Sequence, residues 1–293
     1  MLLAVPNFSE ARDPERVQGI SAAFATGAAL LDMHSDAVHN RTVLTLSGVP
    51  GGLSGALANG ARACVEQIDM ARHQGEHPSI GALDVCPVVW LRTEEREPAR
   101  EEARSAARRI ADEAGVPVFL YGDLASHQSH RERSFFRAGG LVELRRRLAG
   151  GELRPDFGPP ELHPTAGATL VTARPPLAAF NVVLEGASIV EAREIAARLR
   201  ESGGGLPGVR AIGIDLEGGP TQVSTNVHDP AAVPLATVVA RVQELAIPYG
   251  ARVVAAEVVG LVPEAALAGW PDEVPLPAFD PAKHVIERRV RAA

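Results

Sequence analysis

Short apolar segments alternate along the chain with longer segments of helical period. A helix laid on a sheet buries one apolar stripe, and a strand of that sheet is a short apolar run, so this alternation is typical of helices packed on a β-sheet. It restricts the chain to the α/β (α+β) class. In the first half, the segments with strand character are residues 2–5, 29–33, 42–47, 87–91 and 116–122.

The second half has a recognisable order of elements. After a strand at 168–173, it reads strand 177–184, helix 189–200, strands 209–215 and 221–227, helix 235–247 and strand 251–263. A β-hairpin between two helices with flanking strands is the ferredoxin-like arrangement. The first half reads similarly, with extra elements. We therefore expect two ferredoxin-like subdomains, with helices packed on mixed or antiparallel sheets.

The boundary between the halves is marked by composition. Residues 150–167 are rich in Pro and Gly and show neither the period of a strand nor that of a helix, so we interpret them as an inter-lobe loop. The predicted subdomains are residues 1–165 and 166–293. Within the first, alanines at helical spacing predict a helix that ends at Gly115 as its C-cap.

Composition excludes several classes of function. The 293 residues are 46% hydrophobic and carry a net charge of -7. Nucleic acids and anionic membranes are bound by clustered Lys and Arg, so neither is an expected partner and the substrate should be small. Two cysteines, no secretory leader and no apolar run of about 18 residues predict a soluble, cytoplasmic protein with reduced thiols. Phosphate-binding and dinucleotide-binding glycine loops are absent from the sequence.

Residues 73–77, HQGEH, match the H-x-x-E-H pattern of one class of zinc proteases. Two histidines four apart share a metal ion on an unbroken helix, with a third ligand from elsewhere. Pro78 disfavours the helical conformation for His77, and Gly75 is a suitable C-terminal stop for a helix expected over residues 52–70. We therefore expect His77 on a loop and no metal at this site.

The same loop favours a different role for His77. Glu76 precedes it and Asp84 follows it, and a carboxylate near an imidazole raises its basicity and can fix its tautomer. This interpretation makes His77 a general base that moves a proton. The alternatives are a zinc site shared with His73 and a surface histidine without a role.

A second polar segment, residues 32–42, follows an apolar strand and contains Asp36, Asn40 and Arg41. The amide and the guanidinium suit recognition of an anionic or amide-bearing ligand. A metal site and a simple polar turn collect similar residues, so both remain alternatives.

Two further groups of polar residues have a structural and a functional interpretation. Asn7 and Ser9 end the first strand, where polar atoms could gather, but Ser9 or Asp13 could equally be a helix N-cap. Asn181 and Gln222 lie on otherwise apolar strands, where they either pair with the backbone or line a ligand cleft.

Several segments, in order along nearly the whole chain, resemble the formiminotransferase family. They are VPNFSEARD, LLDMHSDAVHNRT, IDMARHQGEHPSIGALDVCP, VPVFLYG, PDFGPPELHPTAGAT, AFNVVL, GLPGVRAIG, QVSTNVHD and VVAAEVVGLVP. The motif GEHPSIGALDVCP is long and specific. The resemblance implies an enzyme that transfers a formimino group from N-formimino-L-glutamate to N5 of tetrahydrofolate, a step of histidine breakdown.

The resemblance also implies a fold and a site. The fold is two ferredoxin-like subdomains around a tunnel that holds the folate, usually in a homodimer. Tetrahydrofolate is the co-substrate and no metal takes part. The histidine of the GEHP motif, His77 here, serves as base and then as acid. The folate-binding segment of the family corresponds to Gly158, Pro159, Pro160, Glu161, Leu162, His163, Pro164, Thr165, Ala166 and Gly167.

Chemistry adds Arg41 or Arg174 as partners for the anionic carboxylates. The residues expected to bind substrate or support the site are Asn7, Asp36, Asn40, Arg41, Glu76, Asp84, Arg174, Asn181 and Gln222. The alternative functions are formyl transfer between 5-formyltetrahydrofolate and glutamate, a metal-dependent hydrolase using His73 and His77, and folate binding with little turnover. This sequence lacks the helical cyclodeaminase domain of some family members, so we expect a separate cyclodeaminase downstream.

Overall fold

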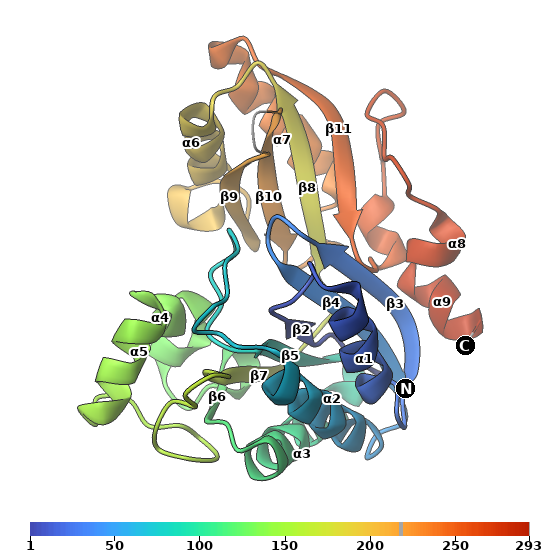
Figure 1. The fold of residues 1–293 in the computed structure, drawn as a ribbon. Coiled ribbons are helices and arrows are strands. Elements are labelled where there is room, and N and C mark those ends of the chain that lie inside the picture. Colours follow the sequence, from blue (N-terminus) through green and yellow to red (C-terminus); the bar gives the residue numbers. More distant parts are fainter. Residues whose placement is uncertain (217–218, 293) are drawn as a thin grey trace. The chain divides into compact units, whose positions relative to one another are not determined.

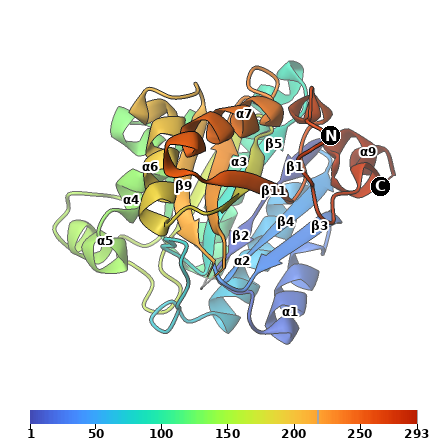
Figure 2. The same ribbon diagram turned by 90° about the horizontal axis from the view of Figure 1, so that it is seen from above.

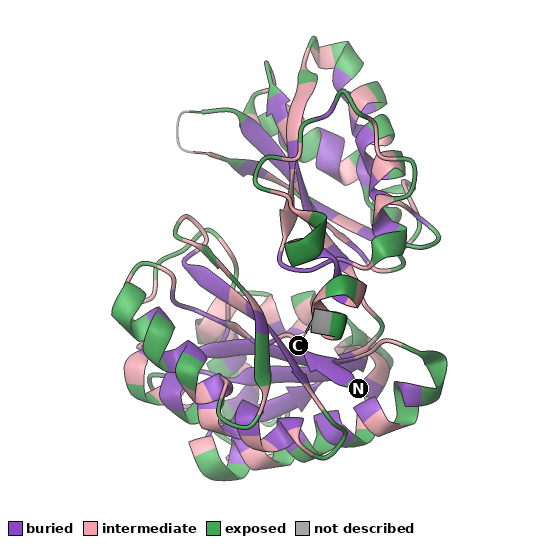
Figure 3. Cartoon of the chain, turned by 90° about the vertical axis from the view of Figure 1, so that its right-hand side faces the viewer, coloured by how far each residue is buried: buried purple, intermediate pink, exposed green. Residues whose placement is uncertain are grey.

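The computed structural model describes residues 1–216 and 219–292 and divides the chain into two compact units, Met1–Arg174 and Pro175–Ala293 (Figure 1). Each unit contains its own β-sheet and its own hydrophobic core. In both units the central strands and the inward faces of the helices are buried (Figure 3).

The first part of unit 1 is an antiparallel sheet with two helices on it. Its elements, in chain order, are β1 (Leu2–Ala4), β2 (Asn7–Phe8), α1 (Pro14–Phe24), β3 (Ala29–Asp36), β4 (Arg41–Gly48), α2 (Leu53–Gln67) and β5 (Leu83–Trp90). β1 and β2 act as one interrupted strand, because both pair with β4 on one side and β5 on the other. β3 pairs with the free side of β4. This lateral order is ferredoxin-like, as the sequence predicts.

An extension continues the sheet beyond β5. Its elements are α3 (Arg96–Ala114), β6 (Val118–Leu120), α4 (Arg133–Arg137), α5 (Gly140–Ala149) and β7 (Thr169–Arg174). β7 pairs in parallel with both β5 and β6, and Gly115 ends α3 in the left-handed conformation, as expected. The strand that the sequence assigned to the second half is therefore the last strand of unit 1. The Pro- and Gly-rich residues 150–167 lie inside this unit, before β7.

Helices cover both faces of the extended sheet. The core beneath α1, α2 and α3 includes Phe8, Phe24 and Ile110, whereas Phe119, Phe136 and Leu144 belong to a separate cluster with α4 and α5. Asp13 caps α1, since its side chain accepts hydrogen bonds from the backbone of Glu15 and Arg16. The N-cap interpretation is thus correct for Asp13.

Unit 2 is a second ferredoxin-like arrangement. Its elements are β8 (Ala178–Glu185), α6 (Ile189–Leu199), β9 (Val209–Asp215), β10 (Thr221–Val227), α7 (Leu235–Ala246) and β11 (Arg252–Val259), followed by α8 (Pro281–His284) and α9 (Ile286–Ala292). The strand order is β11-β8-β10-β9, all antiparallel. α6 and α7 pack on one face of this sheet (Figure 2). The predicted order of elements is confirmed.

In the described part of the chain, no helix is both long and apolar enough to cross a membrane.

The end of α2 differs from the prediction. The helix stops at Gln67, and Ile68 leaves it in an extended conformation with φ −115° and ψ 126°. Two residues later the Met70 N–H donates to the Thr165 carbonyl at 2.7 Å, so a contact distant in sequence draws the chain away from the helix axis. Gly75 is therefore not the C-terminal stop, although His77 does lie on a loop, as expected.

The contact between α1 and α2 depends on a missing side chain. A Cβ on Gly60 would lie 2.1 Å from the ring of Phe24, which is fully buried at the end of α1. A Cβ on Gly55, in the same helix, would meet only the flexible end of Arg109 at 2.9 Å. The two glycines therefore differ in what surrounds them.

Gly60→Ala is expected to lower the free energy of unfolding by about 1–3 kcal/mol, because overpacking outweighs the gain in helix propensity. Gly55→Ala is the matched control and is expected to change it by less than about 1 kcal/mol, towards stabilisation. Urea unfolding followed by circular dichroism measures both variants. Equal effects of the two substitutions would contradict the role of the Phe24 contact.

Candidate active site

The loop of residues 69–82, called here the His77 loop, is fixed at both ends by one other segment. The Met70 N–H donates to the Thr165 carbonyl, and the Ala82 N–H donates to the Ala166 carbonyl at 2.9 Å. The Ala168 N–H in turn donates to the Ile80 carbonyl at 2.9 Å. The segment predicted to bind folate thus ends directly against the loop that carries His77.

Two glycines allow this approach. A Cβ on Gly81 would lie 1.9 Å from the Ala168 carbonyl oxygen, and one on Gly167, where φ is +69°, would lie 2.1 Å from the Ile80 carbonyl oxygen. Neither position tolerates a side chain without moving backbone. The two segments are therefore in direct backbone contact.

The predicted folate segment, residues 158–167, has an exposed part and an anchored part. Glu161, Pro164 and Thr165 are exposed, whereas Leu162 and Ala166 are buried. His163 Nδ1 accepts hydrogen bonds from the backbone N–H groups of Thr165 and Ala166, at 3.3 and 2.9 Å. The histidine shapes the turn, and the exposed residues remain available to a ligand.

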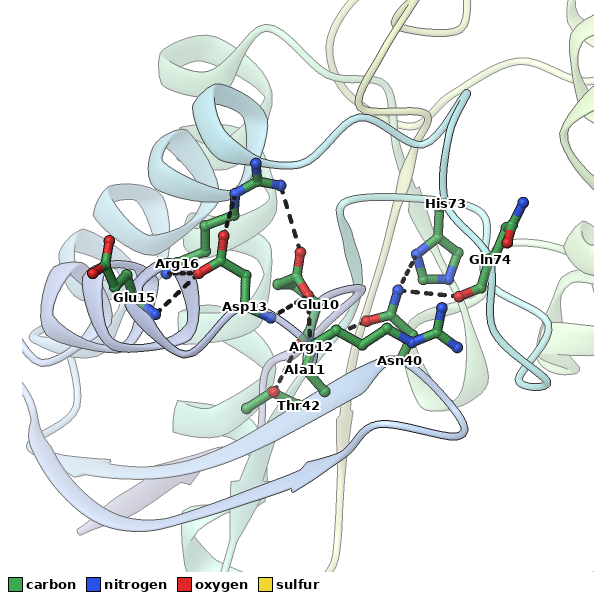
Figure 4. A network of polar contacts seen from close by, with 10 residues as sticks. All are labelled: Glu10, Ala11, Arg12, Asp13, Glu15, Arg16, Asn40, Thr42, His73 and Gln74. Carbon is green, nitrogen blue, oxygen red and sulfur yellow. Dashed lines mark hydrogen bonds and ion pairs between the residues drawn. The ribbon is translucent and has the colours of Figure 1, made fainter. Parts of the chain in front are cut away.

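The turn between β3 and β4 packs on the other side of the His77 loop. Asn40 adopts a positive φ of 47°; its Oδ1 accepts from the Ala11 N–H at 2.9 Å and its Nδ2 donates to the Gln74 carbonyl at 3.1 Å (Figure 4). The Glu76 N–H donates to the Val38 carbonyl at 3.3 Å. The side-chain amide of Asn40 therefore joins its own turn to the backbones of two other segments, at Ala11 and at Gln74. The sequence did not indicate this role.

The buried carboxylate of Asp84 binds two arginine side chains near the His77 loop. The register of β2 against β5 shifts at Asp84, so Asp84 is the extra residue of a β-bulge, a device that re-aims a side chain. Its Oδ2 accepts from Arg41 Nη1 at 2.8 Å and also from Arg137 Nη2, while its Oδ1 accepts from the Ile80 N–H at 2.9 Å. The Arg41 Nε donates to Asn7 Oδ1 at 3.1 Å. Asn7 thus orients Arg41.

The charges in this group do not balance. The Asp84 side chain is fully buried, and those of Arg41 and Arg137 are only 8% and 12% exposed. Burial by itself would raise the pKa of Asp84, but the two guanidinium groups lower it well below its usual value. Burial lowers the pKa of Arg41 to about 10. One carboxylate facing two guanidinium groups leaves a surplus positive charge.

His77 lies in the field of this surplus charge. Burial lowers the pKa of His77 well below its usual value, and Arg41 and Arg137 lower it further, by more than Asp84 raises it. Its Nδ1 is buried and has no hydrogen-bond partner among the described residues. Glu76 is exposed. Asp84 does raise the pKa of His77, as the sequence predicts, but burial and the two arginines outweigh it, and Glu76 faces solvent.

Further arginines surround the same group. Arg133 and Arg137 both come from α4, and the guanidinium of Arg133 lies 6.0 Å from the centre of the Tyr121 ring. Burial lowers the pKa of Arg174 to about 10, and Arg133 contributes to that shift. Sequence reasoning missed Arg133 and Arg137. The available signal was the stretch RERSFFR, in which three arginines accompany a single acidic residue.

Asn181 and Gln222 belong to unit 2. Both lie on strands of its sheet, on the face opposite α6 and α7, because the alternate residues such as Phe180 and Val223 belong to the core. The Asn181 Nδ2 donates to Glu257 Oε2 at 3.0 Å, a side chain on the neighbouring strand. The Nδ2 of Asn181 therefore pairs with a side chain of the same sheet face.

The residues of the metal hypothesis are arranged differently from a helical metal motif. Residues 71–79 form no helix, so His73 and His77 do not lie on successive turns. His73 Nδ1 lies 3.4 Å from Asn40 Nδ2. Within residues 1–216 and 219–292, no three His, Cys, Asp or Glu side chains come together as a possible set of metal ligands.

The chain is similar to known proteins along nearly its whole length. Residues 1–174 match the family described as the formiminotransferase domain, N-terminal subdomain, and residues 179–270 match the formiminotransferase domain. A glutamate formimidoyltransferase of Streptococcus pyogenes serotype M1 is 37% identical over 98% of this chain and 97% of its own length. A second protein of that name, from Thermoplasma acidophilum, is 35% identical over 90% of this chain and 88% of its own length.

Longer proteins match as well. The formimidoyltransferase-cyclodeaminase of Sus scrofa is 42% identical over 90% of this chain, which spans 50% of that protein.

The charge balance predicts that His77 stays neutral in the free protein. A pKa below the usual 6.5 keeps the ring unprotonated at neutral pH and down into mild acid, so its NMR signals should titrate little between about pH 5 and 8. Arg137→Met should raise the pKa towards 6.5, because it removes one positive charge. Arg146→Met is the control, since Arg146 is exposed on α5 and pairs with Glu143 and Glu152. A His77 ring that titrates near 6.5 in the unmodified chain would refute this account.

Proposed function

The chain belongs to the formiminotransferase family, and we propose that it is a glutamate formimidoyltransferase, which moves the formimino group of N-formimino-L-glutamate to N5 of tetrahydrofolate. The names of the full-length relatives support the activity. The single observation in the structure that carries the proposal is the position of His77, whose buried Nδ1 has no hydrogen-bond partner among the described residues and lies in the field of a cationic cluster, on a loop anchored to residues 165–168.

His77 is proposed as the base of the transfer. The reaction forms a bond between N5 of tetrahydrofolate and the formimino carbon, and breaks the bond between that carbon and the glutamate nitrogen. The proton on N5 must leave, and a neutral imidazole accepts it. His77 is suited to this step because its surroundings keep it unprotonated and its Nδ1 has no partner among the described residues. A ligand that supplies such a partner is favoured, since an unpaired buried nitrogen costs free energy.

Arg41 and Arg137 are proposed to bind a carboxylate of the formimino donor. Arg41 was expected in this role, and Arg137 joins it through their common partner Asp84. The Nε of Arg137 is buried without a partner among the described residues. A guanidinium pair with surplus charge matches an anionic oxygen pair in both sign and geometry. Holding the donor in this way also fixes the formimino carbon relative to the base.

The folate is proposed to lie along residues 158–167, next to the His77 loop. The backbone contacts of Thr165, Ala166 and Ala168 with that loop support the placement, because they bring the two segments together without any ligand. Asn181 and Gln222, on the sheet of unit 2, are proposed as substrate-binding residues. A homodimer and a cytoplasmic location complete the proposal by likeness to the family.

The alternatives are less well supported. Formyl transfer from 5-formyltetrahydrofolate to glutamate would use the same base and the same cationic cluster, so only the choice of substrates distinguishes it. A hydrolase using His73 and His77 is disfavoured, since these residues do not share a helix. The family's named relatives are transferases.

The direct test is to mix the purified protein with N-formimino-L-glutamate and tetrahydrofolate and to measure 5-formiminotetrahydrofolate. We expect turnover, and we expect His77→Asn to lower kcat by about 100- to 10,000-fold, the usual contribution of a general base. His127→Asn is the control, because His127 is an exposed histidine of the same unit. Turnover only with 5-formyltetrahydrofolate and glutamate would replace the main proposal with its alternative.

Arg137→Met tests the carboxylate site. It should raise the KM for formiminoglutamate by about tenfold or more, as loss of a charged hydrogen bond of about 1.5–3 kcal/mol implies, and leave the KM for tetrahydrofolate within about threefold. Arg146→Met should leave both constants unchanged. A larger effect on the KM for tetrahydrofolate would assign the cluster to the folate tail instead.

A further inference from the structure

A carboxylate and an imidazole form a fixed pair on the turn between β3 and β4. The Oδ2 of Asp36 lies 2.6 Å from Nδ1 of His39. The Oδ1 of the same carboxylate accepts hydrogen bonds from the backbone N–H groups of Val38 and His39, at 2.9 and 3.0 Å. Both oxygens are therefore engaged, and the ring of His39 is held through Nδ1.

This pair lies next to His77. The ring centres of His39 and His77 are 6.4 Å apart, with the ring planes at 64° to each other. The spacing is set by backbone contacts, because a Cβ on Gly75 would lie 2.4 Å from the His39 carbonyl oxygen and the Glu76 N–H bonds to the Val38 carbonyl. The side chain of His39 is only 13% exposed. The two imidazoles thus lie edge to face on two loops held together by backbone contacts.

The two rings have opposite charge surroundings. Burial would raise the pKa of Asp36, but the hydrogen bonds from the ring and backbone of His39 outweigh burial and lower it to about 2, so a full negative charge lies against His39 at neutral pH. His77 instead faces the surplus positive charge of Arg41 and Arg137. A proton on His39 would have a counter-charge beside it, whereas a proton on His77 would be repelled. Paired titratable groups in contrasting surroundings commonly divide the roles of acid and base.

We infer that His39 is a second acid–base residue of the transfer, which donates a proton to the departing glutamate nitrogen, and that Asp36 is its positioning residue. The inference rests on the proposed formimino transfer and deepens it. It changes one assignment, since the resemblance alone gives both proton steps to His77.

The protons balance over one turnover. His77 accepts the proton that leaves N5 as the new carbon–nitrogen bond forms. His39 gives the proton that the glutamate nitrogen gains as the old bond breaks. The enzyme is then left with a protonated His77 and a neutral His39, and the proton returns from His77 to His39 through solvent before the next turnover. With Nδ1 held by Asp36, the exchanging atom of His39 is Nε2.

Other charged or titratable groups border this turn: Arg41 begins β4 two residues after His39, and His73 Nδ1 lies 3.4 Å from Nδ2 of Asn40. Arg12 donates from Nε to the Ala37 carbonyl at 2.9 Å, and the exposed Glu76 lies on the facing loop. The direct partners of the His39 ring are Asp36 on its own turn and His77 across from it.

Asp36→Asn tests the positioning role. An asparagine still accepts the two backbone hydrogen bonds of the turn, but its Nδ2 offers protons to the ring, so the neutral tautomer should move its proton from Nδ1 to Nε2. Nitrogen-15 NMR of the histidine side chains measures this change without any substrate. We expect the tautomer of His39 to invert and kcat to fall about 10- to 1,000-fold, with both KM values within about threefold. An unchanged tautomer overturns the inference.

His39→Gln tests the acid role. We expect the variant to lower kcat by about 10- to 1,000-fold. Asp229→Asn is the control, since Asp229 is an exposed carboxylate of unit 2 whose Oδ1 accepts a hydrogen bond from the Ala232 N–H at 3.1 Å. Wild-type turnover in His39→Gln overturns this inference alone. A wild-type chain without transferase activity overturns it together with the proposed function.

Discussion

The buried carboxylate of Asp84 is the interaction on which the site depends. It joins Arg41 at the start of β4, Arg137 at the end of α4 and the backbone of the His77 loop at Ile80. A buried charge without a partner costs several kcal/mol, so these three elements must meet for the fold to accept Asp84 at all. The same arrangement leaves more positive than negative charge. The ion pairs of Asp84 with Arg41 and Arg137 therefore have two effects: they hold these elements together, and they set the charge around His77.

The extension of unit 1 explains why this site forms there. A ferredoxin-like sheet occurs in both units, and in unit 1 it continues through β7 and β6. The connection to β7 passes through α4, which supplies Arg137, and through residues 163–168, which anchor the His77 loop. The four-stranded arrangement supplies Arg41 and Asp84 but neither of these additions. The site is thus built where the common architecture and its extension meet.

The strands and helices were predicted well from the sequence, because the hydrophobic periodicity of each element is local. Both ferredoxin-like sheets were predicted in the same way. It predicted the end of α2 poorly, since a hydrogen bond from Met70 to Thr165 decides where that helix stops. The downward shift in the pKa of His77 was also not predicted. Asp84 is close to His77 in sequence, but its strongest partners lie 43 and 53 residues away, at Arg41 and Arg137. Neighbours in sequence reveal which groups are present, and only the fold reveals which of them are already engaged.

The surplus charge gives the proposed reaction an order of events. A base must hold a proton once it has taken one, and Arg41 and Arg137 oppose that on His77 in the free protein. A carboxylate bound between the arginines would cancel the surplus, and the pKa of His77 would rise accordingly. Under the proposed function, binding of the formimino donor therefore raises the pKa of His77, which is the base that the transfer of the formimino group requires. His77 would stay neutral and ready while the site is empty, and would become a competent proton acceptor when the formimino carbon is in place.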